Sequence, residues 1–516
     1  MAVETEQHPG APAGLELPPA AAPFRRSLAG RLAADRWTIA FLGVLAVGAV
    51  ARFWDLGTRP GWQPDEPVYA SIGRTLLLHG TLNDRIEAGL PWAPFLFHPP
   101  FYFLVLDGWF RVFGAGIPAA RALSVVSSLV AFALVWALLR RLYDVRLATI
   151  TTTLLVFDGW LLFVERVSYI ENTLMVLVVL TLVLYRRALE HPTTARLVLA
   201  GASLGATAVF KQTGAYLLVV VLLHAFIRRD RRAHLAIFGT AFLVIAAYVS
   251  YMGIAYDYGG HDWFVTDTLI QLRRTFGLRA SGGTLTSPLK ALHLLSRQYA
   301  VFLPSLLVAI SAFVVMVVRV VQCVRRRSFA PVEHVGLLFA WSWGAVVTFA
   351  AISLRFPEYF VLVLVPLYCY LYVEAVLFVG KRREGAGSAR SGLVRRGWVA
   401  PAAVGLLVAL GLGSATLRVY SRHDNALGAV AAYARAHIPH GATVITIESI
   451  GDEIPQPWCD EQRASACASS ASYVITYTTF LQGNPPDDPA FYAKLRQLVR
   501  LATFRGFKET VTVWGP

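Results

Sequence analysis

The sequence predicts a polytopic α-helical membrane protein with a small extracytoplasmic α/β domain at its C-terminus. Of its 516 residues, 56% are hydrophobic and only 15% are charged, whereas soluble domains carry about 25% charged residues. Apolar segments of spanning length recur up to residue 417, and short clusters of Arg and Lys separate them. Beyond residue 418 the pattern changes to short strands and amphipathic helices.

Residues 1–36 are predicted to form a disordered cytoplasmic tail, because the stretch begins rich in Ala, Pro and Glu. Four arginines between residues 25 and 36 precede the first apolar span, so the N-terminus is expected in the cytoplasm. The stretch lacks the form of a cleaved signal peptide, and the first span is therefore expected to remain as an anchor.

A membrane domain, residues 37–417, is predicted to contain about eleven transmembrane helices. The spans are expected at 37–54, 117–139, 147–164, 168–185, 195–211, 213–227, 233–254, 298–318, 334–353, 357–379 and 400–417. The apolar segment 101–113 is too short to cross, and we expect it to lie in the interface. With this count, the large Arg and Lys clusters fall on the cytoplasmic side. The expected location is the plasma membrane.

The net charge of +15 does not predict nucleic-acid binding, because the cations lie in short loops between apolar spans. The domain after residue 418 is predicted to contain a helix at 426–437, strands near 441–449 and 472–480, a helix at 489–501 and a final edge or terminal strand at 507–514. Cys459 and Cys467 in this domain are expected to form a disulfide if it is extracytoplasmic.

The first outer loop, residues 52–116, holds an adjacent acid pair, Asp65 and Glu66, between two prolines and near Tyr69. Carboxylates this close to a bilayer are costly unless they are paired or functional. A carboxylate held by prolines and aromatic rings can act as a general base on an acceptor hydroxyl or amine. A solvated turn is the alternative interpretation.

Three cations are predicted to reach the same outer surface as the acid pair: Arg166, Lys211 and Arg355. Cations that face the interior of a bundle often bind phosphate, and the alternative is that they extend to the lipid headgroups. Further candidate substrate contacts are Tyr69, His98, Glu171 and Tyr359, although His98 before a double proline also fits a structural turn.

The order of these segments resembles the family 39 glycosyltransferases of the GT-C superfamily. The resemblance rests on WQPDE at 62–66, HPP at 98–100, FVERVSYIEN at 163–172, GASLGATAVFKQTG at 201–214 and RFPEYFVLVLVP at 355–366. It covers roughly residues 37–380. The family includes dolichyl-phosphate-mannose protein mannosyltransferases and bacterial lipid A aminoarabinose transferases.

The resemblance implies an inverting transfer, at the outer face, of a mannose-like or other sugar from a polyprenyl-phosphate donor. Asp65 then corresponds to the catalytic carboxylate and Glu66 to its companion acid. Glu171 matches the acid that follows the family's arginine. The cations Arg166, Lys211 and Arg355 would neutralise the departing phosphate. Phe97-His98 stands where aminoarabinose transferases have Glu-Lys, so a lysine contact to phosphate is missing there.

The predicted partners are the lipid-linked sugar donor, a glycan, lipid or protein acceptor, and the bilayer. We expect no required metal, because two adjacent acids make a poor metal site, and a divalent cation is the alternative. A transporter or lipid flippase is the alternative function, but such a protein would place ionisable groups near the bilayer midplane and show inverted repeats. A non-catalytic scaffold is the third interpretation.

Overall fold

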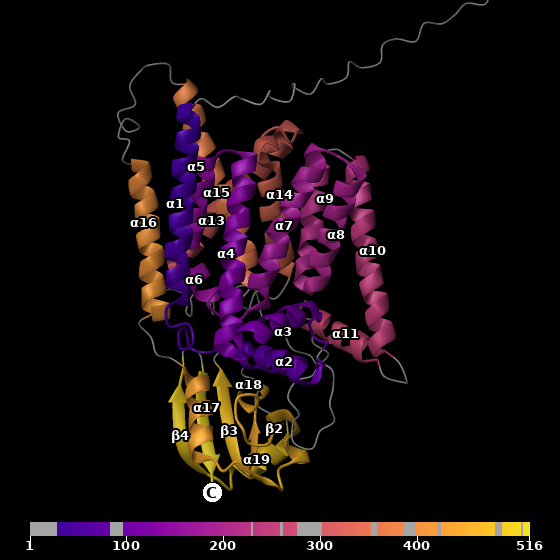
Figure 1. Ribbon diagram of the computed structural model, residues 1–516, viewed down its shortest axis with the longest axis vertical. Coiled ribbons are helices and arrows are strands. Elements are labelled where there is room, and N and C mark those ends of the chain that lie inside the picture. The colour runs from indigo at the N-terminus through magenta and orange to yellow at the C-terminus, as the bar shows by residue number, and fades with distance from the viewer. Residues whose placement is uncertain are drawn as a thin grey trace, which may run out of the picture.

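A computed structural model describes residues 28–82, 96–228, 231–257, 262–275, 302–351, 359–385, 399–420, 425–479, 488–506 and 509–516. A bundle of long helices forms the membrane domain, and a small mixed sheet sits at one end of it (Figure 1). This arrangement confirms the predicted helical membrane fold with a C-terminal α/β domain.

The described helices of the membrane domain are labelled α1 to α11 and α13 to α16. Their bounds are α1 Leu28–Phe53, α2 Asp65–His79, α3 Phe101–Phe113, α4 Ile117–Leu142, α5 Val145–Val156, α6 Gly159–Val164, α7 Ile170–Glu190, α8 Thr194–Phe210, α9 Tyr216–Arg228, α10 Arg231–Tyr256, α11 Trp263–Thr275, α13 Leu303–Arg326, α14 Gly336–Ala351, α15 Phe360–Gly385 and α16 Val399–Ala415. Short helical turns occur at Gln212–Ala215, Glu333–Val335 and Thr416–Tyr420.

Each predicted span has a helical counterpart, but the helices differ in length. Among the described residues, six helices are long and apolar enough to cross a membrane, namely α1, α4, α7, α10, α13 and α15. The predicted span 147–164 is not one helix: α5 ends at Val156, and Asp158 caps α6 by accepting a hydrogen bond from the Leu161 N–H at 3.0 Å. Helix α1 begins at Leu28, inside the stretch expected to be a disordered tail.

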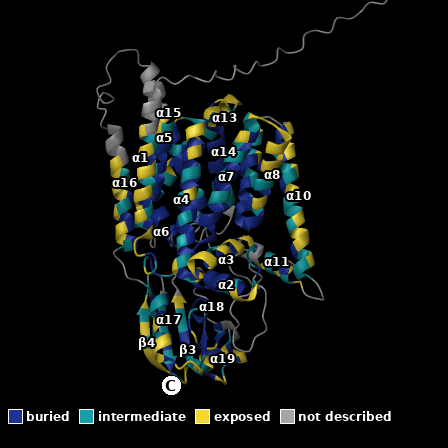
Figure 2. Cartoon of the chain, in the orientation of Figure 1, coloured by how far each residue is buried: buried dark blue, intermediate teal, exposed yellow. Residues whose placement is uncertain are grey.

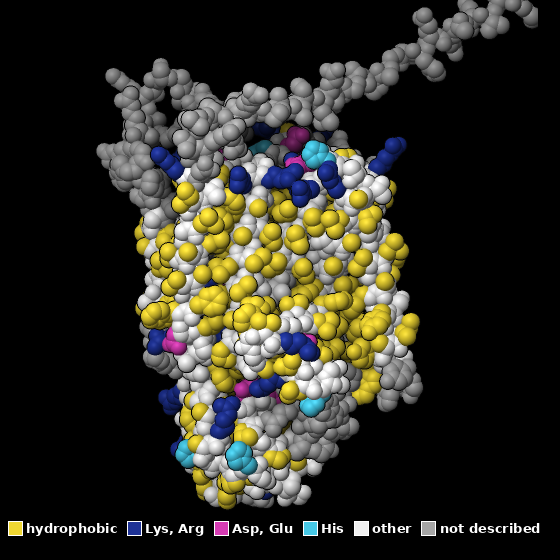
Figure 3. Space-filling view, viewed as in Figure 1, with side chains coloured by type: hydrophobic (Ala, Val, Ile, Leu, Met, Phe, Trp, Pro, Cys, Tyr) yellow, Lys and Arg dark blue, Asp and Glu magenta, His cyan; other side chains and the backbone are white. Residues whose placement is uncertain are grey.

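Many exposed residues of α1, α10 and α13 are apolar, and Figure 2 shows exposed residues along α1 and α10 and buried ones in the interior of the bundle. Lys and Arg side chains gather at the end of the bundle away from the sheet, beyond an apolar band (Figure 3). Helices α4 and α13 carry arginine pairs in their last turns, at 140–141 and 325–326. An apolar band bounded by charges is the surface expected of a chain that spans a bilayer.

Helices α2 and α3 lie across the end of the bundle that faces the sheet (Figure 1). Helix α3 has the bounds predicted for an interfacial helix, and buries Phe103, Leu106 and Phe110 while exposing apolar residues on its other face. Gly73 permits close packing of α2 on α3, because a Cβ there would lie 2.8 Å from the Leu106 side chain. The two helices therefore form one packed unit.

The C-terminal domain, residues 425–516 in the structure, is a five-stranded sheet in the order β2-β1-β3-β5-β4. Its elements are α17 Ala426–His437, β1 Thr443–Thr446, α18 Glu448–Gly451, β2 Trp458–Asp460, β3 Ala471–Thr479, α19 Pro489–Leu495, β4 Val499–Arg505 and β5 Glu509–Gly515, with a 3-10 turn at Glu461–Ala466. Strand β1 runs parallel to β2 and β3, whereas β5 runs antiparallel to β3 and β4.

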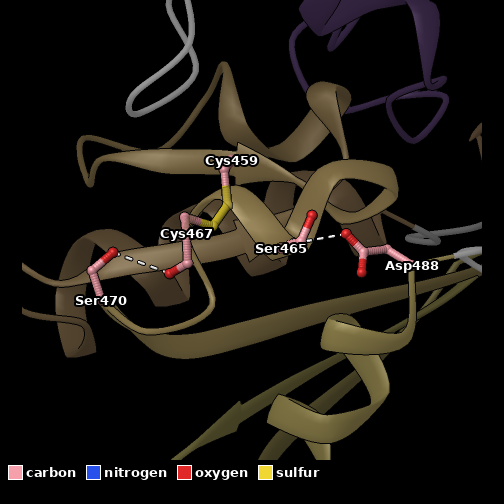
Figure 4. Close-up of a disulfide and its surroundings, with 5 residues drawn as sticks. All are labelled: Cys459, Ser465, Cys467, Ser470 and Asp488. Carbon is pink, nitrogen blue, oxygen red and sulfur yellow. Dashed lines mark hydrogen bonds between the residues drawn. A yellow bond between two sulfur atoms is a disulfide. The ribbon is translucent and has the colours of Figure 1, made fainter.

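Both faces of this sheet are covered, because alternate strand residues point to opposite faces. Val444 and Ile475 pack with α17, whereas Ile445 and Val474 pack with Phe491 of α19 and with the cysteines. Cys459 and Cys467 form the expected disulfide, and Asp488 accepts a hydrogen bond from the Ser465 N–H at 2.7 Å beside it (Figure 4).

One prediction for this domain was wrong. The helix expected at 489–501 ends at Leu495, and residues 499–505 form strand β4, because the apolar run there pairs with β5. The final strand, expected as an edge or terminal strand, is the last strand of the chain and lies inside the sheet between β3 and β4.

Candidate active site

The acid pair of the first outer loop lies at the beginning of α2, and its two carboxylates face different surroundings. Asp65 is the first residue of the helix and is exposed, whereas Glu66 is completely buried. A carboxylate in the first turn is favoured there by the helix dipole. The exposed acid is therefore accessible to a substrate, and the buried acid is not.

Glu66 forms the centre of a buried polar network. Arg121 of α4 donates from Nε to Oε1 at 2.7 Å and from Nη2 to Oε2 at 2.6 Å. The Ser168 N–H donates to Oε1 at 2.8 Å, and the Gln63 N–H donates to Oε2 at 2.7 Å. A bidentate arginine with two further donors satisfies the carboxylate, which fixes the start of α2 against the bundle.

This network changes the role expected for Glu66. The sequence suggested a catalytic companion acid for Asp65, but the carboxylate accepts from four N–H donors and has no exposed surface. Arg121 was not identified from the sequence. The signal was present, because a charged residue near the start of an apolar span is costly without a partner.

Tyr69 and His98 lie together beside α3. The Tyr69 hydroxyl is 3.2 Å from Nε2 of His98, and the two rings meet edge to face with centroids 5.9 Å apart. Next to them, the Tyr102 hydroxyl is 3.1 Å from Oγ of Ser168, the residue whose N–H binds Glu66. Two predicted substrate contacts therefore adjoin the network that positions the acid pair.

Lys211 lies in the break between α8 and α9. Its Nζ donates to Oε1 of Glu171 at 2.5 Å, and it stands 5.6 Å from the centroid of the Tyr359 ring. All three side chains are buried. Oε2 of Glu171 has no hydrogen-bond partner in the described part of the chain. The structure thus brings together three of the predicted substrate contacts.

The Lys211 group is linked to the His98 segment. Gln212, the next residue, donates from Nε2 to the carbonyl oxygen of Phe97 at 3.1 Å. The segment from Phe97 to Tyr102 therefore connects Lys211 and Glu171 on one side with the start of α2 on the other. Arg355, the remaining predicted cation, lies outside the described residues.

Arg166 has a structural environment that differs from the one expected. The side chain is buried, and its guanidinium donates to carbonyl oxygens near the end of α1. The acceptors are Ala51 at 2.7 Å, Arg52 at 2.6 Å, Trp54 at 2.5 Å, Asp55 at 3.3 Å and Arg59 at 2.8 Å. The last carbonyls of a helix need such donors. In this structure Arg166 holds the end of α1 and the loop after it, and its donors are not directed at a phosphate site.

A second buried ion pair stands next to this helix end. Arg52 donates from Nε to Oε2 of Glu165 at 2.7 Å, and both side chains are buried. This pair was also missed in the sequence, although Glu165 directly precedes Arg166. Within the described residues, no group of three His, Cys, Asp or Glu side chains is arranged to hold a metal ion.

A family model described as dolichyl-phosphate-mannose-protein mannosyltransferase matches residues 97–253. No curated protein sequence matches the chain. The matched segment contains His98, Glu171 and Lys211, but not the acid pair.

Solved structures match over most of the chain. ArnT from Cupriavidus metallidurans bound to undecaprenyl phosphate is 16% identical and has a TM-score of 0.61, and the match covers 92% of this chain and 98% of ArnT. The Archaeoglobus fulgidus oligosaccharyltransferase tethered with an acceptor peptide is 14% identical and has a TM-score of 0.52, with 84% and 69% of the two chains covered. The predicted resemblance is confirmed at the level of the fold, which this chain shares with both of these structures.

Proposed function

We propose that this chain is an inverting glycosyltransferase that moves a sugar from a polyprenyl-phosphate donor to an acceptor at the outer face of the plasma membrane. The observation that carries the proposal is the exposed carboxylate of Asp65, held at the start of α2 by the buried pair of Glu66 and Arg121. The fold shared with ArnT, whose structure contains undecaprenyl phosphate, supports the class of donor.

The proposed reaction uses Asp65 as a general base. Its carboxylate takes the proton from an acceptor hydroxyl or amine, whose oxygen or nitrogen attacks the anomeric carbon of the donor sugar. The bond from that carbon to the phosphate oxygen breaks, the configuration inverts, and polyprenyl phosphate leaves with the bonding electrons. A general base in such a position contributes about 10²–10⁴ in rate.

The departing phosphate gains negative charge and needs cations nearby. Lys211 can serve this purpose, because only one carboxylate oxygen and one aromatic ring hold its ammonium group in the described structure. Arg355 is proposed as a second cation, because the sequence predicts that it reaches the same outer surface as the acid pair. The acceptor is a glycan, lipid or protein, and the proposal requires no divalent metal because Lys211 and Arg355 would supply the positive charge.

The orientation of the chain is part of the proposal. The end of the bundle with α2, α3 and the C-terminal domain is assigned to the outside, because arginine clusters gather at the opposite end (Figure 3). The disulfide of Cys459 and Cys467 agrees with this assignment, since disulfides persist in oxidising compartments.

The test is sugar transfer by the full-length protein in nanodiscs. The donors are undecaprenyl-phosphate-linked sugars, with mannose first, and the acceptors are extracts of the producing cells. Asp65→Asn should lower acceptor-dependent release of undecaprenyl phosphate by about 10²-fold or more, and a chelator should leave transfer unchanged.

Asp107→Asn is the matched control for this experiment. Asp107 also lies in the first outer loop but pairs with Arg111 on α3, so its substitution should leave transfer near the wild-type rate. Near-normal transfer by Asp65→Asn would remove Asp65 from its proposed role. Loss of transfer after metal removal, restored by a divalent cation, would overturn the metal-independent mechanism.

A further inference from the structure

The C-terminal domain touches the first outer loop on both sides of Asp65. Before it, the Trp62 N–H donates to Oδ1 of Asn425 at 3.1 Å, and the same oxygen caps α17 by accepting from the Gly428 N–H at 3.0 Å. The Trp62 ring packs against both the core of the bundle and the core of the C-terminal domain. Movement of α17 would therefore displace the loop that leads into α2.

After Asp65, the contact is an ion pair. Arg74 of α2 donates from Nη2 to Oε1 of Glu453 at 2.8 Å and to the carbonyl oxygen of Asp452 at 3.1 Å. Glu453 is 8% exposed and Arg74 is 30% exposed, so the pair is partly shielded from water. On its other side Glu453 faces Arg435 of α17, with Oε2 and Nη2 3.6 Å apart. The carboxylate thus joins α2 to the C-terminal domain.

Helix α2 is consequently held on two sides. Arg121 fixes its first turn to the bundle through Glu66, and Glu453 fixes its third turn to the C-terminal domain. Arg74 lies nine positions after Asp65, which is about 13–14 Å along a helix. Helix α2 also packs closely against α3, because a Cβ at Gly73 would lie 2.8 Å from the Leu106 side chain.

We infer that the C-terminal domain is a positioning element for Asp65, acting through the contact of Arg74 with Glu453. This inference rests on the proposed function, since it assigns the domain a task in the same reaction. A displacement of about 1 Å at a catalytic group can cost about 10²-fold in rate. Loosening α2 at its third turn should therefore lower the rate of transfer without changing the affinity for the donor lipid.

The experiment compares Arg74→Ala, Glu453→Ala and the double variant with the wild type, each as the full-length protein in nanodiscs. Hydrogen exchange of the peptides that cover α2 is the first measurement. Each variant should exchange about threefold to fivefold faster there, as expected for loss of a partly exposed ion pair. The double variant should exchange no faster than either single variant, because both remove the same contact.

Arg111→Ala is the matched control, since it breaks the exposed ion pair of Arg111 with Asp107 on α3 and leaves the contact of Arg74 with Glu453 intact. It should leave exchange in α2 unchanged. Arg74→Lys should restore much of the protection, because it keeps the charge. In the transfer assay Arg74→Ala should lower kcat with KM for the donor unchanged, and its binding of undecaprenyl phosphate should equal that of the wild type.

Two results would overturn the inference. One is unchanged exchange in α2 in both single variants. The other is faster exchange in α2 together with a wild-type kcat, which would show that the contact of Arg74 with Glu453 stabilises α2 without affecting catalysis. Both results differ from failure of the proposed function, which would appear as near-normal transfer by Asp65→Asn with the exchange effects intact.

Discussion

Arg166 directs its guanidinium to backbone carbonyls at the end of α1, whereas Lys211 holds one carboxylate oxygen of Glu171. Both are buried cations at the ends of apolar segments, and from the sequence both were candidate phosphate ligands. Carbonyl oxygens cannot leave a helix end without unwinding it. A single carboxylate, by contrast, can share its cation with an arriving phosphate.

The comparison separates two uses of a buried cation in this fold. Arg166 stabilises the backbone before α2, and Arg121 does the same at the beginning of α2 through Glu66. Lys211 has fewer partners and lies beside Tyr359 and the segment with His98. The number and kind of partners therefore separate Arg166 and Arg121 from Lys211, which we propose as a substrate cation, although the residues alone look alike.

The largest effect is expected for Arg166→Lys. An ammonium group cannot reach carbonyls spread from residue 51 to residue 59, and each unsatisfied buried acceptor costs roughly 1–3 kcal/mol. The folded yield and the thermal stability in detergent should fall sharply, with several kcal/mol lost. Arg111→Lys on α3 is the control and should be neutral. If Arg166→Lys folds normally but binds undecaprenyl phosphate weakly, Arg166 is a phosphate ligand and the comparison fails.

The next effect concerns Lys211 and its partner. Lys211→Met alone should lose about 3–5 kcal/mol of stability, because Glu171 would be left as a buried unpaired charge. Adding Glu171→Gln should restore folding, yet binding of undecaprenyl phosphate should remain at least about tenfold weaker than in the wild type. The measurement is the affinity of each variant for undecaprenyl phosphate, determined with the protein in nanodiscs.

A second ion pair gives the control for that experiment. Arg319 of α13 and Glu374 of α15 also form a pair, with Nη2 and Oε2 2.7 Å apart. Changing Arg319→Met with Glu374→Gln removes the same charges from this other pair. It should leave binding of undecaprenyl phosphate unchanged. Equal binding of undecaprenyl phosphate by both double variants and the wild type would show that Lys211 has a structural role, as Arg166 has.

The smallest effect is expected for Glu461, an acid whose charged neighbour is another acid. Burial, and then the nearby charge of Asp460, raise the pKa of Glu461 in the C-terminal domain to about 7. The folded state then binds this proton more tightly than the unfolded state. The protonated carboxyl of Glu461 therefore contributes fully to the stability of the folded state below the ordinary pKa near 4.5. This contribution is lost as pH rises through 7.

Glu461→Gln should therefore stabilise the C-terminal domain by about 1–2 kcal/mol at pH 8, a value discounted for partial access to water, and have little effect at pH 4. Proteolysis of the full-length protein in a urea series at both pH values measures the difference. Asp460→Asn should give a smaller gain in the same direction. An equal gain at both pH values would show that ionisation of Glu461 is not the cause.

Much of the fold could be predicted because its signals are local. Apolar length located the helical spans, and arginine clusters at helix ends distinguished the two ends of the bundle. The bounds of α3 and α17 agree with the predicted ranges 101–113 and 426–437. The boundary between α19 and β4 was missed, because an amphipathic pattern fits either a helix or a strand until the pairing strand is known.

The site could be predicted only as a set of residue types. Asp65 and Glu66 are neighbours with the same chemistry, and nothing in their order says which one is buried. That depends on Arg121, which lies 55 positions after Glu66. In the same way, Glu453 is 379 positions from Arg74.

Composition and periodicity alone determined that this chain crosses a membrane, ends in an α/β domain and carries acids and cations at the edges of its spans, because burial in lipid constrains every stretch of backbone separately. Only the tertiary structure decided which charges neutralise one another. Ion pairs form over a few ångströms between helices that are distant in the sequence, so packing selected Glu66 for Arg121 and Glu171 for Lys211 and left Asp65 exposed.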